Sequence, residues 1–229
     1  MAPQAIISYD DTPNDQDALV LGHLFADAGA RLTLAYVRHR TEVEHALDER
    51  DQHAAEALLE RGAQWLEDCV SVERKVIVSA STGEGLSWLA AHDRADVIVF
   101  GSDYRTPPGH VAPGRSAQML IEGGPTAIAI APAGYRERRD APIHMVGLLA
   151  DHRDDSALET AQQLAAEHDA VIVRDDPRVD LLVVGSRAEA RPGRVMLSSR
   201  TANTIEDATC PVLILARGVA LEFGSLVTY

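Results

Sequence analysis

The sequence contains few cysteines and few aromatic residues. Its 229 residues include two cysteines, Cys69 and Cys210, which lie far apart and lack metal-ligand spacing. We therefore expect buried thiols in a reducing compartment rather than a disulfide framework or a zinc site. Aromatic residues make up 4% of the chain, against 46% for all hydrophobic residues. The core must consequently be built from alanine, valine, leucine and isoleucine.

Long apolar runs and positive charge are also scarce. No run of about 18 apolar residues occurs, which argues against a membrane-spanning helix. The N-terminus MAPQAIISYDD leads directly into a strand, so we expect no targeting segment. The formal charge of −14 disfavours nucleic acids and anionic membranes as partners, because their phosphates would be repelled. The expected location is the cytoplasm.

The segment that organises the chain is DVIVFGSDYRTPPGHVAPGRS, residues 96–116. Its apolar run, Val97 to Phe100, is short and β-branched, as expected of a buried strand. A loop with glycines and prolines follows, and AQMLIEG then predicts a short helix beginning near Ser116. A strand, a glycine-bearing loop and a helix start can present backbone N–H groups to an anion. A plain capped surface loop is the alternative.

The same pattern recurs in DLLVVGSRAEARPGRVMLSS, residues 180–199. Both segments have an acid, an apolar strand and a Gly-Ser stop. After each loop come a short helix and another apolar strand, TAIAIAP in the first copy and CPVLILA in the second. The chain therefore contains one unit twice.

Both copies resemble the end of a universal stress protein domain, whose signature is G-x2-G-x9-G-[ST] between the fourth strand and the fourth helix. In the first copy Gly101 and Gly114 match the outer glycines. Tyr104 stands in place of the second glycine and Arg115 in place of the hydroxyl residue, with Ser116 one position later. The match within this loop is partial.

In the second copy Gly185 and Ser199 match, whereas Ala188 and Ser198 replace the two remaining glycines. The surrounding strand–helix–strand pattern supports the resemblance more strongly than the loops do. The resemblance covers roughly residues 3–217.

The first unit alternates strands with helical patterns, which predicts an α/β lobe: a parallel sheet with helices on both faces. Strands are expected at 5–10, 31–37, 72–80, 97–100 and 126–130. Helices are expected after a cap at Asn14 or Asp15, from about Glu42 to Asp68, after Thr82, and from Ser116 to Ile121. The resemblance implies the strand order 3-2-1-4-5. Ligands of such sheets bind beyond the carboxyl ends of the strands, where the order reverses.

The second unit is a trimmed copy. Residues 143–217 repeat the first strand, its helix and the second strand, but only Arg174 to Val179 separate that strand from LLVVG. A parallel crossover normally takes a dozen or more residues, so we expect a narrower sheet or an irregular connection. The predicted domains are 1–133 (first lobe), an exposed linker at 134–142, 143–217 (second lobe) and a tail at 218–229. The tail is read as an extra edge strand or a disordered end.

The resemblance implies an adenine nucleotide, ATP or a similar one, as ligand of the first lobe, with no metal beyond the Mg²⁺ that accompanies it. An acid such as Asp10 can accept a hydrogen bond from a ribose hydroxyl, and glycines let backbone approach phosphates. A turn and helix cap is the alternative interpretation of Asp10 and Asp11. Tyr104 could stack on the ligand or obstruct it. The candidate binding residues are Asp10, Asp11, Thr12, Val37, Gly101, Tyr104, Gly114, Arg115 and Ser116.

Other chemistries lack their motifs. Among nine histidines, His39, His45 and His53 are spaced by six and eight residues, which places no two on one helical turn as ligands. His110 alone lies in the signature loop. No catalytic triad order, G-x-S-x-G elbow or H-E-x-x-H motif occurs. Catalytic turnover is therefore not expected.

Two functions remain. The first is a stress-response regulatory protein that binds an adenine nucleotide in the first lobe. The second is a degenerate family member that binds no nucleotide and acts as an interaction protein or scaffold. A homodimer and an unidentified protein partner both stay open. We further expect Ile98 and Val183 to be buried, and the two lobes to pair through Ala127 to Ile130 and Val212 to Leu215, because pairing protects apolar edge strands.

Overall fold

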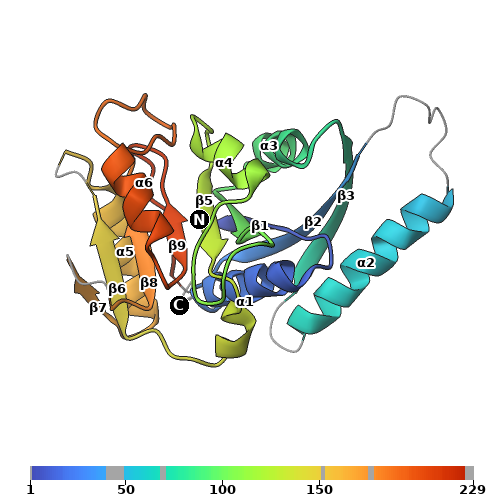
Figure 1. Ribbon diagram of the computed structural model, residues 1–229, viewed down its shortest axis with the longest axis horizontal. Helices are drawn as coiled ribbons and strands as arrows, with labels where there is room; N and C mark the ends of the chain where they lie inside the picture. Colours follow the sequence, from blue (N-terminus) through green and yellow to red (C-terminus); the bar gives the residue numbers. More distant parts are fainter. Residues whose placement is uncertain (1, 40–48, 68–70, 151–152, 175–177, 225–229) are drawn as a thin grey trace, which may run out of the picture.

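The computed structural model describes residues 2–39, 49–67, 71–150, 153–174 and 178–224. The fold is α/β: one mixed β-sheet runs through both lobes, and helices cover its two faces (Figure 1). The elements of the first lobe are β1 (Gln4–Ser8), α1 (Pro13–Asp27), β2 (Arg31–His39), α2 (Glu49–Glu67), β3 (Val72–Ser79), α3 (Thr82–Asp93), β4 (Val97–Gly101), α4 (Arg115–Ile121) and β5 (Ala127–Ala131). A 3₁₀ turn, η1 (Tyr135–Arg138), follows. The second lobe comprises β6 (Met145–Leu149), α5 (Ser156–Glu167), β7 (Val171–Val173), β8 (Leu181–Val184), α6 (Ser199–Glu206) and β9 (Val212–Ile214).

The sheet has nine strands in the order β3-β2-β1-β4-β5-β9-β8-β6-β7. The predicted order 3-2-1-4-5 of the first lobe is confirmed, and the second lobe has a reduced version of it. Every pairing is parallel except that of β5 with β9, where Ile128 faces Ile214 and Ile130 faces Val212. The predicted pairing of the lobes through these strands is thus confirmed, and it removes two apolar edges.

Alternation along the strands divides the core into two layers. Residues such as Ile7, Val99 and Leu213 face α1, α2 and α5, whereas Ile6, Ile98 and Ile214 face α3, α4 and α6. Both faces of the central strands are covered, which explains why those strands are continuous apolar runs. Ile98 and Val183 are wholly buried, as the sequence predicted.

The short connection of the second lobe leads from one side of β6 to the other. β7 and β8 lie on opposite sides of β6 and run parallel to it. A Cβ at Gly147 would lie 3.0 Å from both methyl groups of Val179, a residue of this connection. The missing side chain of Gly147 therefore makes room for Val179 over β6. Among the described residues the second lobe contributes β6, β7, β8 and β9 to the sheet, which is the narrower sheet that the sequence predicted.

Three details differ from the sequence prediction. Helix α1 is capped by Thr12 rather than by Asn14 or Asp15. The linker is not wholly exposed, because Tyr135 is buried against the core. The tail contains no strand in its described part, residues 218–224, where Leu221 and Phe223 are buried and Phe223 packs on Phe25 with ring centroids 5.4 Å apart. The expected helix start at Glu42, together with His45 and Cys69, lies outside the described residues.

Candidate functional site

The carboxyl ends of β1, β2 and β4 bring three candidate residues to one edge of the sheet. Ser8 pairs with Ala35, and Ile7 pairs with Val99. Continuing these two registers by two residues aligns Asp10 with Val37 and Tyr9 with Gly101, just beyond the end of β1. This edge is where the strand order reverses, between β1 and β4, as the sequence predicted.

Asp10 has an exposed side chain whose carboxylate has no cation bound to it among the described residues. Desolvation and the nearby Asp15 carboxylate raise its pKa to about 6, and the positive potential of His39 partly offsets them. The backbone N–H of Asp10 donates to Asp15 at 3.0 Å. An acid with such a raised pKa is typical of a functional position.

The Asp11 carboxylate is engaged in structure. Asp11 has a positive φ of 61° and accepts hydrogen bonds from the Tyr9 hydroxyl at 2.8 Å and from the Arg61 guanidinium at 2.6 and 3.0 Å. The hydrogen bonds from Arg61 and Tyr9 lower its pKa. Asp11 therefore joins the start of α1 to α2.

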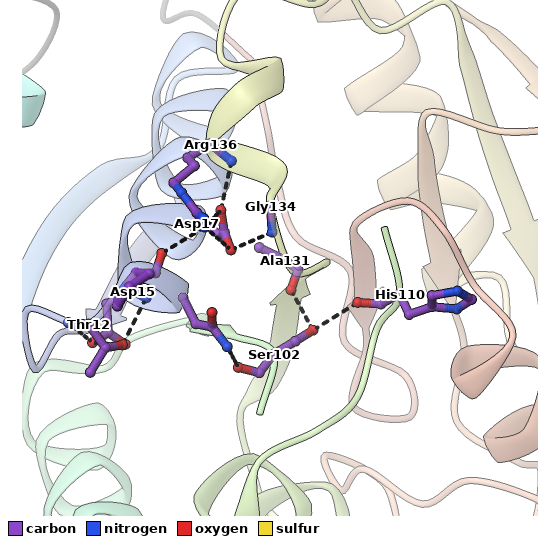
Figure 2. A network of polar contacts seen from close by, with 10 residues as sticks. Thr12, Asp15, Asp17, Ser102, His110, Ala131, Gly134 and Arg136 are labelled. Atoms are coloured by element: carbon purple, nitrogen blue, oxygen red, sulfur yellow. Dashed lines mark hydrogen bonds and ion pairs between the residues drawn. The ribbon is translucent and has the colours of Figure 1, made fainter. Parts of the chain in front are cut away.

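Thr12 and Asp15 form a capping box at the N-terminus of α1 (Figure 2). The Thr12 hydroxyl accepts from the Asp15 N–H at 3.3 Å, and the Asp15 carboxylate accepts from the Thr12 N–H at 2.9 Å. Each group satisfies a backbone donor that the first turn leaves unpaired. The helix cap that the sequence suggested as an alternative role for Asp10 and Asp11 is thus present, but Thr12 and Asp15 form it.

Val37 is almost wholly buried rather than open to a ligand. A Cβ at Gly85 of α3 would lie 2.8 Å from a Val37 methyl group, so helix α3 packs closely on this side chain. For Val37 to pack against the base of a nucleotide, helix α3 would therefore have to leave room for the ligand beside this side chain.

Gly101 allows α1 to approach β4. A Cβ at this position would overlap the carbonyl oxygen of Asn14, while the Asn14 side-chain amide donates to the Ser102 carbonyl at 2.7 Å. The buried Ser102 hydroxyl donates to the Ala131 carbonyl at 2.7 Å (Figure 2). It also accepts from the Ala112 N–H at 3.2 Å. The first signature glycine and the serine after it thus fix the root of the loop.

Gly114, the last signature glycine, faces open space. It is the N-cap residue of α4 with φ of −67° and ψ of 167°, and a Cβ there would meet no atom within 4 Å. Arg115 and Ser116 form the first turn of α4, with Arg115 exposed. Nothing in the protein itself therefore requires a glycine at 114.

The N-terminus of α3 belongs to the same region, which the sequence analysis did not recognise. A Cβ at Gly83 would lie 3.6 Å from the Ser116 carbonyl oxygen, so the first turns of α3 and α4 are neighbours. The imidazole of His39 lies 3.0 Å from the Thr82 hydroxyl and acts electrostatically on Asp10. The signal that could have found this region is the Ser-Thr-Gly run at 81–83, a helix cap directly after a strand.

The Tyr104 side chain packs against little of the protein. Its side chain is 73% exposed, and the Arg105 guanidinium lies 4.9 Å from the centre of its ring. The ring is thus free to move toward or away from a ligand. His110, the loop histidine, contributes its backbone carbonyl to the Ser102 network rather than its ring (Figure 2).

The second lobe repeats the hydrogen bonds of the loop. Ser186 donates to the Leu215 carbonyl at 2.7 Å and accepts from the Met196 N–H at 3.0 Å, as Ser102 does in the first lobe. Gly109 and Gly193 likewise donate to the carbonyl groups of Ala133 and Arg217, each at 2.8 Å. When the two loops are aligned by these hydrogen bonds, Ser198 is the counterpart of Gly114, and Gly193 is the counterpart of Gly109.

Each loop also crosses to the other lobe. The Val111 N–H donates to the Ala208 carbonyl of the second lobe at 3.2 Å, and the Val195 N–H donates to the Gly124 carbonyl of the first at 2.9 Å. Val111 and Val195 occupy equivalent positions in the two loops, and so do the acceptors Gly124 and Ala208, so the two hydrogen bonds form a reciprocal pair. Both valines are buried. The signature loops therefore form part of the contact between the lobes as well as the candidate site.

The described residues contain no group of three or more histidine, cysteine, aspartate or glutamate side chains arranged to hold a metal ion. Within the same ranges, none of the helices has the length and apolarity that a membrane crossing requires.

Comparison with known proteins agrees with this architecture. Residues 168–216 match the model of the universal stress protein family, and the match falls on the trimmed lobe rather than on the complete one. A search of curated proteins found no match. A universal stress protein from Archaeoglobus fulgidus DSM 4304 has the same fold, with a TM-score of 0.71 and 15% identity over 94% of this chain and 98% of that one.

A second solved structure, a Pseudomonas aeruginosa UCBPP-PA14 protein assigned to the same family, gives a TM-score of 0.66 at 13% identity, covering 95% of this chain and 94% of that one. At such identities the two structures establish the fold, and the family match rests on residues 168–216. The resemblance seen in the sequence is therefore confirmed: the chain has the fold of universal stress proteins over nearly its whole length, and its residues 168–216 match the model of the universal stress protein family.

Proposed function

We propose that this chain is a stress-response regulatory protein that binds an adenine nucleotide, ATP or a close analogue with its Mg²⁺, in the first lobe. The observation that carries the proposal is the combination of an uncompensated acid and an unfilled glycine at one sheet edge. Asp10 has a carboxylate with a raised pKa, and Gly114 borders open space. Neither feature improves the stability of the protein, so a ligand is the reason that we infer for both.

The chemistry of the region suits the parts of a nucleotide. The Asp10 carboxylate can accept hydrogen bonds from ribose hydroxyls. Backbone N–H groups at the starts of α3 and α4 can donate to phosphate oxygens, and Gly114 leaves room for phosphate to approach the backbone. Arg115 adds an exposed cation in a chain whose formal charge is −14.

The alternative is a scaffold or interaction protein that binds no nucleotide. Two observations favour it: the Asp11 carboxylate is already paired with Arg61, and Val37 is covered by α3. Under this alternative the acids serve only to cap α1 and to attach α2. Measured affinity for ATP separates the two proposals.

Calorimetric titration of Mg·ATP into the parent and three variants provides the test. Gly114→Val should abolish binding, because its side chain enters space that the protein leaves open. It should lower the melting temperature only slightly, because Gly114 caps α4 without a side-chain hydrogen bond. Ser198→Val should lower the melting temperature more and leave binding intact. It removes the cap that accepts from the Thr201 N–H at 3.1 Å, at a cost of about 1 kcal/mol.

Tyr104→Gly distinguishes the two roles of that ring. Affinity should rise if the tyrosine obstructs the ligand and fall if the ring stacks on it. No heat from either the parent or Tyr104→Gly would reject nucleotide binding and leave the scaffold function. Equal loss of binding in Gly114→Val and Ser198→Val would show that the site does not lie in the first lobe.

A further inference from the structure

Strand β3 ends the sheet and has one strand neighbour. Its eight residues pair with β2, and no described strand lies on its other side (Figure 1). The opposite end of the sheet is closed by β7, which is only three residues long. A long unpaired edge is a template for another strand, and proteins usually protect such an edge with charge or a cover.

Only the first half of β3 carries this protection. Arg74 forms an ion pair with Glu60 of α2, and the Lys75 ammonium lies 2.6 Å from Asp93 of α3. The second half, Val76 to Val78, has no charged residue, and Val78 is 44% exposed. The edge is therefore blocked at one end and open at the other.

A groove of about 490 Å³ follows this open half. It is lined by Val76, Ile77, Val78 and Ser79 of β3 and by Glu84, Gly85 and Trp88 of α3. The Trp88 side chain is 59% exposed, and its ring stacks on His92 with centroids 5.0 Å apart, which holds it in one orientation. We call this groove, with the open edge of β3, the β3 edge groove.

The composition of the groove indicates what it would hold. Trp88 offers apolar surface on the α3 face of the edge and Val78 offers it on the opposite face, and the strand offers backbone groups to an extended segment. The Glu84 carboxylate is exposed, and within the described ranges no hydrogen bond or ion pair engages it. A basic residue placed beside the apolar one would complement it, and the charge of −14 would favour a basic partner at longer range.

We propose that the β3 edge groove docks an extended segment of another protein, in which apolar and basic residues alternate, as an added strand. A second copy of this chain fits less well, because it would bring another −14 charge and its own Glu84, while its basic β3 residues are already ion-paired. The groove shares the first turn of α3 with the candidate nucleotide site, but the proposal rests on the backbone of β3, on Val78 and on Trp88, none of which belongs to that site.

Fluorescence anisotropy with the full chain tests the proposal. The probe is fluorescein-labelled Lys-Val-Lys-Val-Lys-Val-Lys with an amidated C-terminus. The peptide control has the same residues with a methyl group on every backbone nitrogen between residues, which keeps charge and side chains but removes the backbone donors of both strand edges. We expect the probe to bind in 150 mM salt, about the physiological value, and the methylated control to bind about tenfold or more weakly.

The protein variants separate the groove from general electrostatics. Trp88→Ala and Val78→Lys should each weaken the probe about tenfold. The matched control is Val171→Lys, which places the same charge on a 60% exposed valine of the other edge strand, β7, and should leave the affinity unchanged.

Three results would overturn the proposal. The first is equal binding of the methylated peptide or unchanged affinity in Trp88→Ala and Val78→Lys. The second is an equal loss in Val171→Lys. The third is no binding by the probe. If light scattering then finds a dimer that Val78→Lys dissociates, a second copy of the chain is the occupant of the groove.

Discussion

At the scale of single residues, the start of α1 holds three carboxylates with different roles. Asp11 is neutralised by Arg61, and Asp15 accepts three hydrogen bonds, from the Asp10 N–H and from the Thr12 N–H and hydroxyl. Asp10 has neither a cation nor a capping role, and its pKa rises to about 6. The ionised form of Asp10 is therefore disfavoured in the folded protein, whereas that of Asp11 is favoured.

This difference predicts opposite effects of two isosteric changes. The folded-state pKa of Asp10 lies above its ordinary value of 3.8, so its ionisation lowers stability fully above about pH 6 and not at all below about pH 4. Asp10→Asn should consequently raise the melting temperature by a few degrees at pH 7.5 and leave it unchanged at pH 4.

Asp11→Asn is the control for this prediction. Hydrogen bonds from Arg61 and Tyr9 lower the pKa of Asp11, so its charge contributes stability above the ordinary pKa that is lost as the pH falls. The variant should melt at a lower temperature than the parent at pH 7.5. Melting curves at several pH values check both variants, and a lower melting temperature for Asp10→Asn at pH 7.5 would contradict the prediction.

Asp17 is a buried carboxylate that the sequence analysis did not single out. Its side chain is wholly buried and accepts from the Gly134 N–H at 2.8 Å, the Arg136 N–H at 2.7 Å and the Arg136 guanidinium at 3.0 Å (Figure 2). The linker after β5 is thereby held against α1. Sequence alone gave no reason to separate this acid from the exposed ones around it.

Removing this carboxylate should be costly. Asp17→Ala leaves two N–H donors and a guanidinium, all partly buried, without the wholly buried carboxylate that accepts from them, so the free energy of unfolding should fall by about 3 kcal/mol. Urea unfolding at pH 7.5 measures the change. Glu137→Ala, on the same turn but with an exposed side chain, should change the free energy by less than about 0.5 kcal/mol. Equal effects of the two changes would show that the linker is not held by Asp17.

At the scale of elements, the strands could be predicted more fully than their connections. The apolar runs of β1, β4 and β5 are buried on both faces, so their periodicity and length identified them. The linker was wrongly expected to be exposed because its charged residues outnumber Tyr135, the one side chain that anchors it. Candidate residues were expected at the carboxyl ends of β1, β2 and β4, and the structure brings those strand ends to one sheet edge. The neighbouring start of α3 was missed because packing between helices, not local sequence, brings Gly83 to Ser116.

The close contact of Gly147 with Val179 in the second lobe predicts a coupled pair of residues. A Cβ at Gly147 would already contact Val179 and Leu182 at 3.0 and 3.1 Å. Gly147→Val should therefore lower the free energy of unfolding by about 1–3 kcal/mol through overpacking. Val179→Ala alone should also destabilise, because the valine packs over β6. In the double variant the losses should partly cancel, and simple additivity would show that the two residues do not meet.

At the scale of the whole molecule, the two lobes form one continuous structure. Strands β5 and β9 join their sheets, and the signature loops exchange hydrogen bonds through Val111 and Val195. The core layers also continue across the junction, since residues of both lobes occur in each apolar cluster. The second lobe, although trimmed, therefore supports the loop that carries Gly114 in the first.

This continuity predicts that damage to one lobe unfolds the other. Both tryptophans, Trp65 and Trp88, lie in the first lobe, so tryptophan fluorescence reports on that lobe alone, whereas far-ultraviolet circular dichroism reports on both. Val183→Asp introduces an unpaired charge at a wholly buried position of the second lobe and should cost about 3 kcal/mol or more. In urea the fluorescence midpoint should fall together with the dichroism midpoint, by about 1 M or more. Ile98→Asp in the first lobe should give the same coincident shift. A Val183→Asp protein whose fluorescence midpoint stays at the parent value while its dichroism midpoint falls would show two independently folding lobes, and the second could not then support the site of the first.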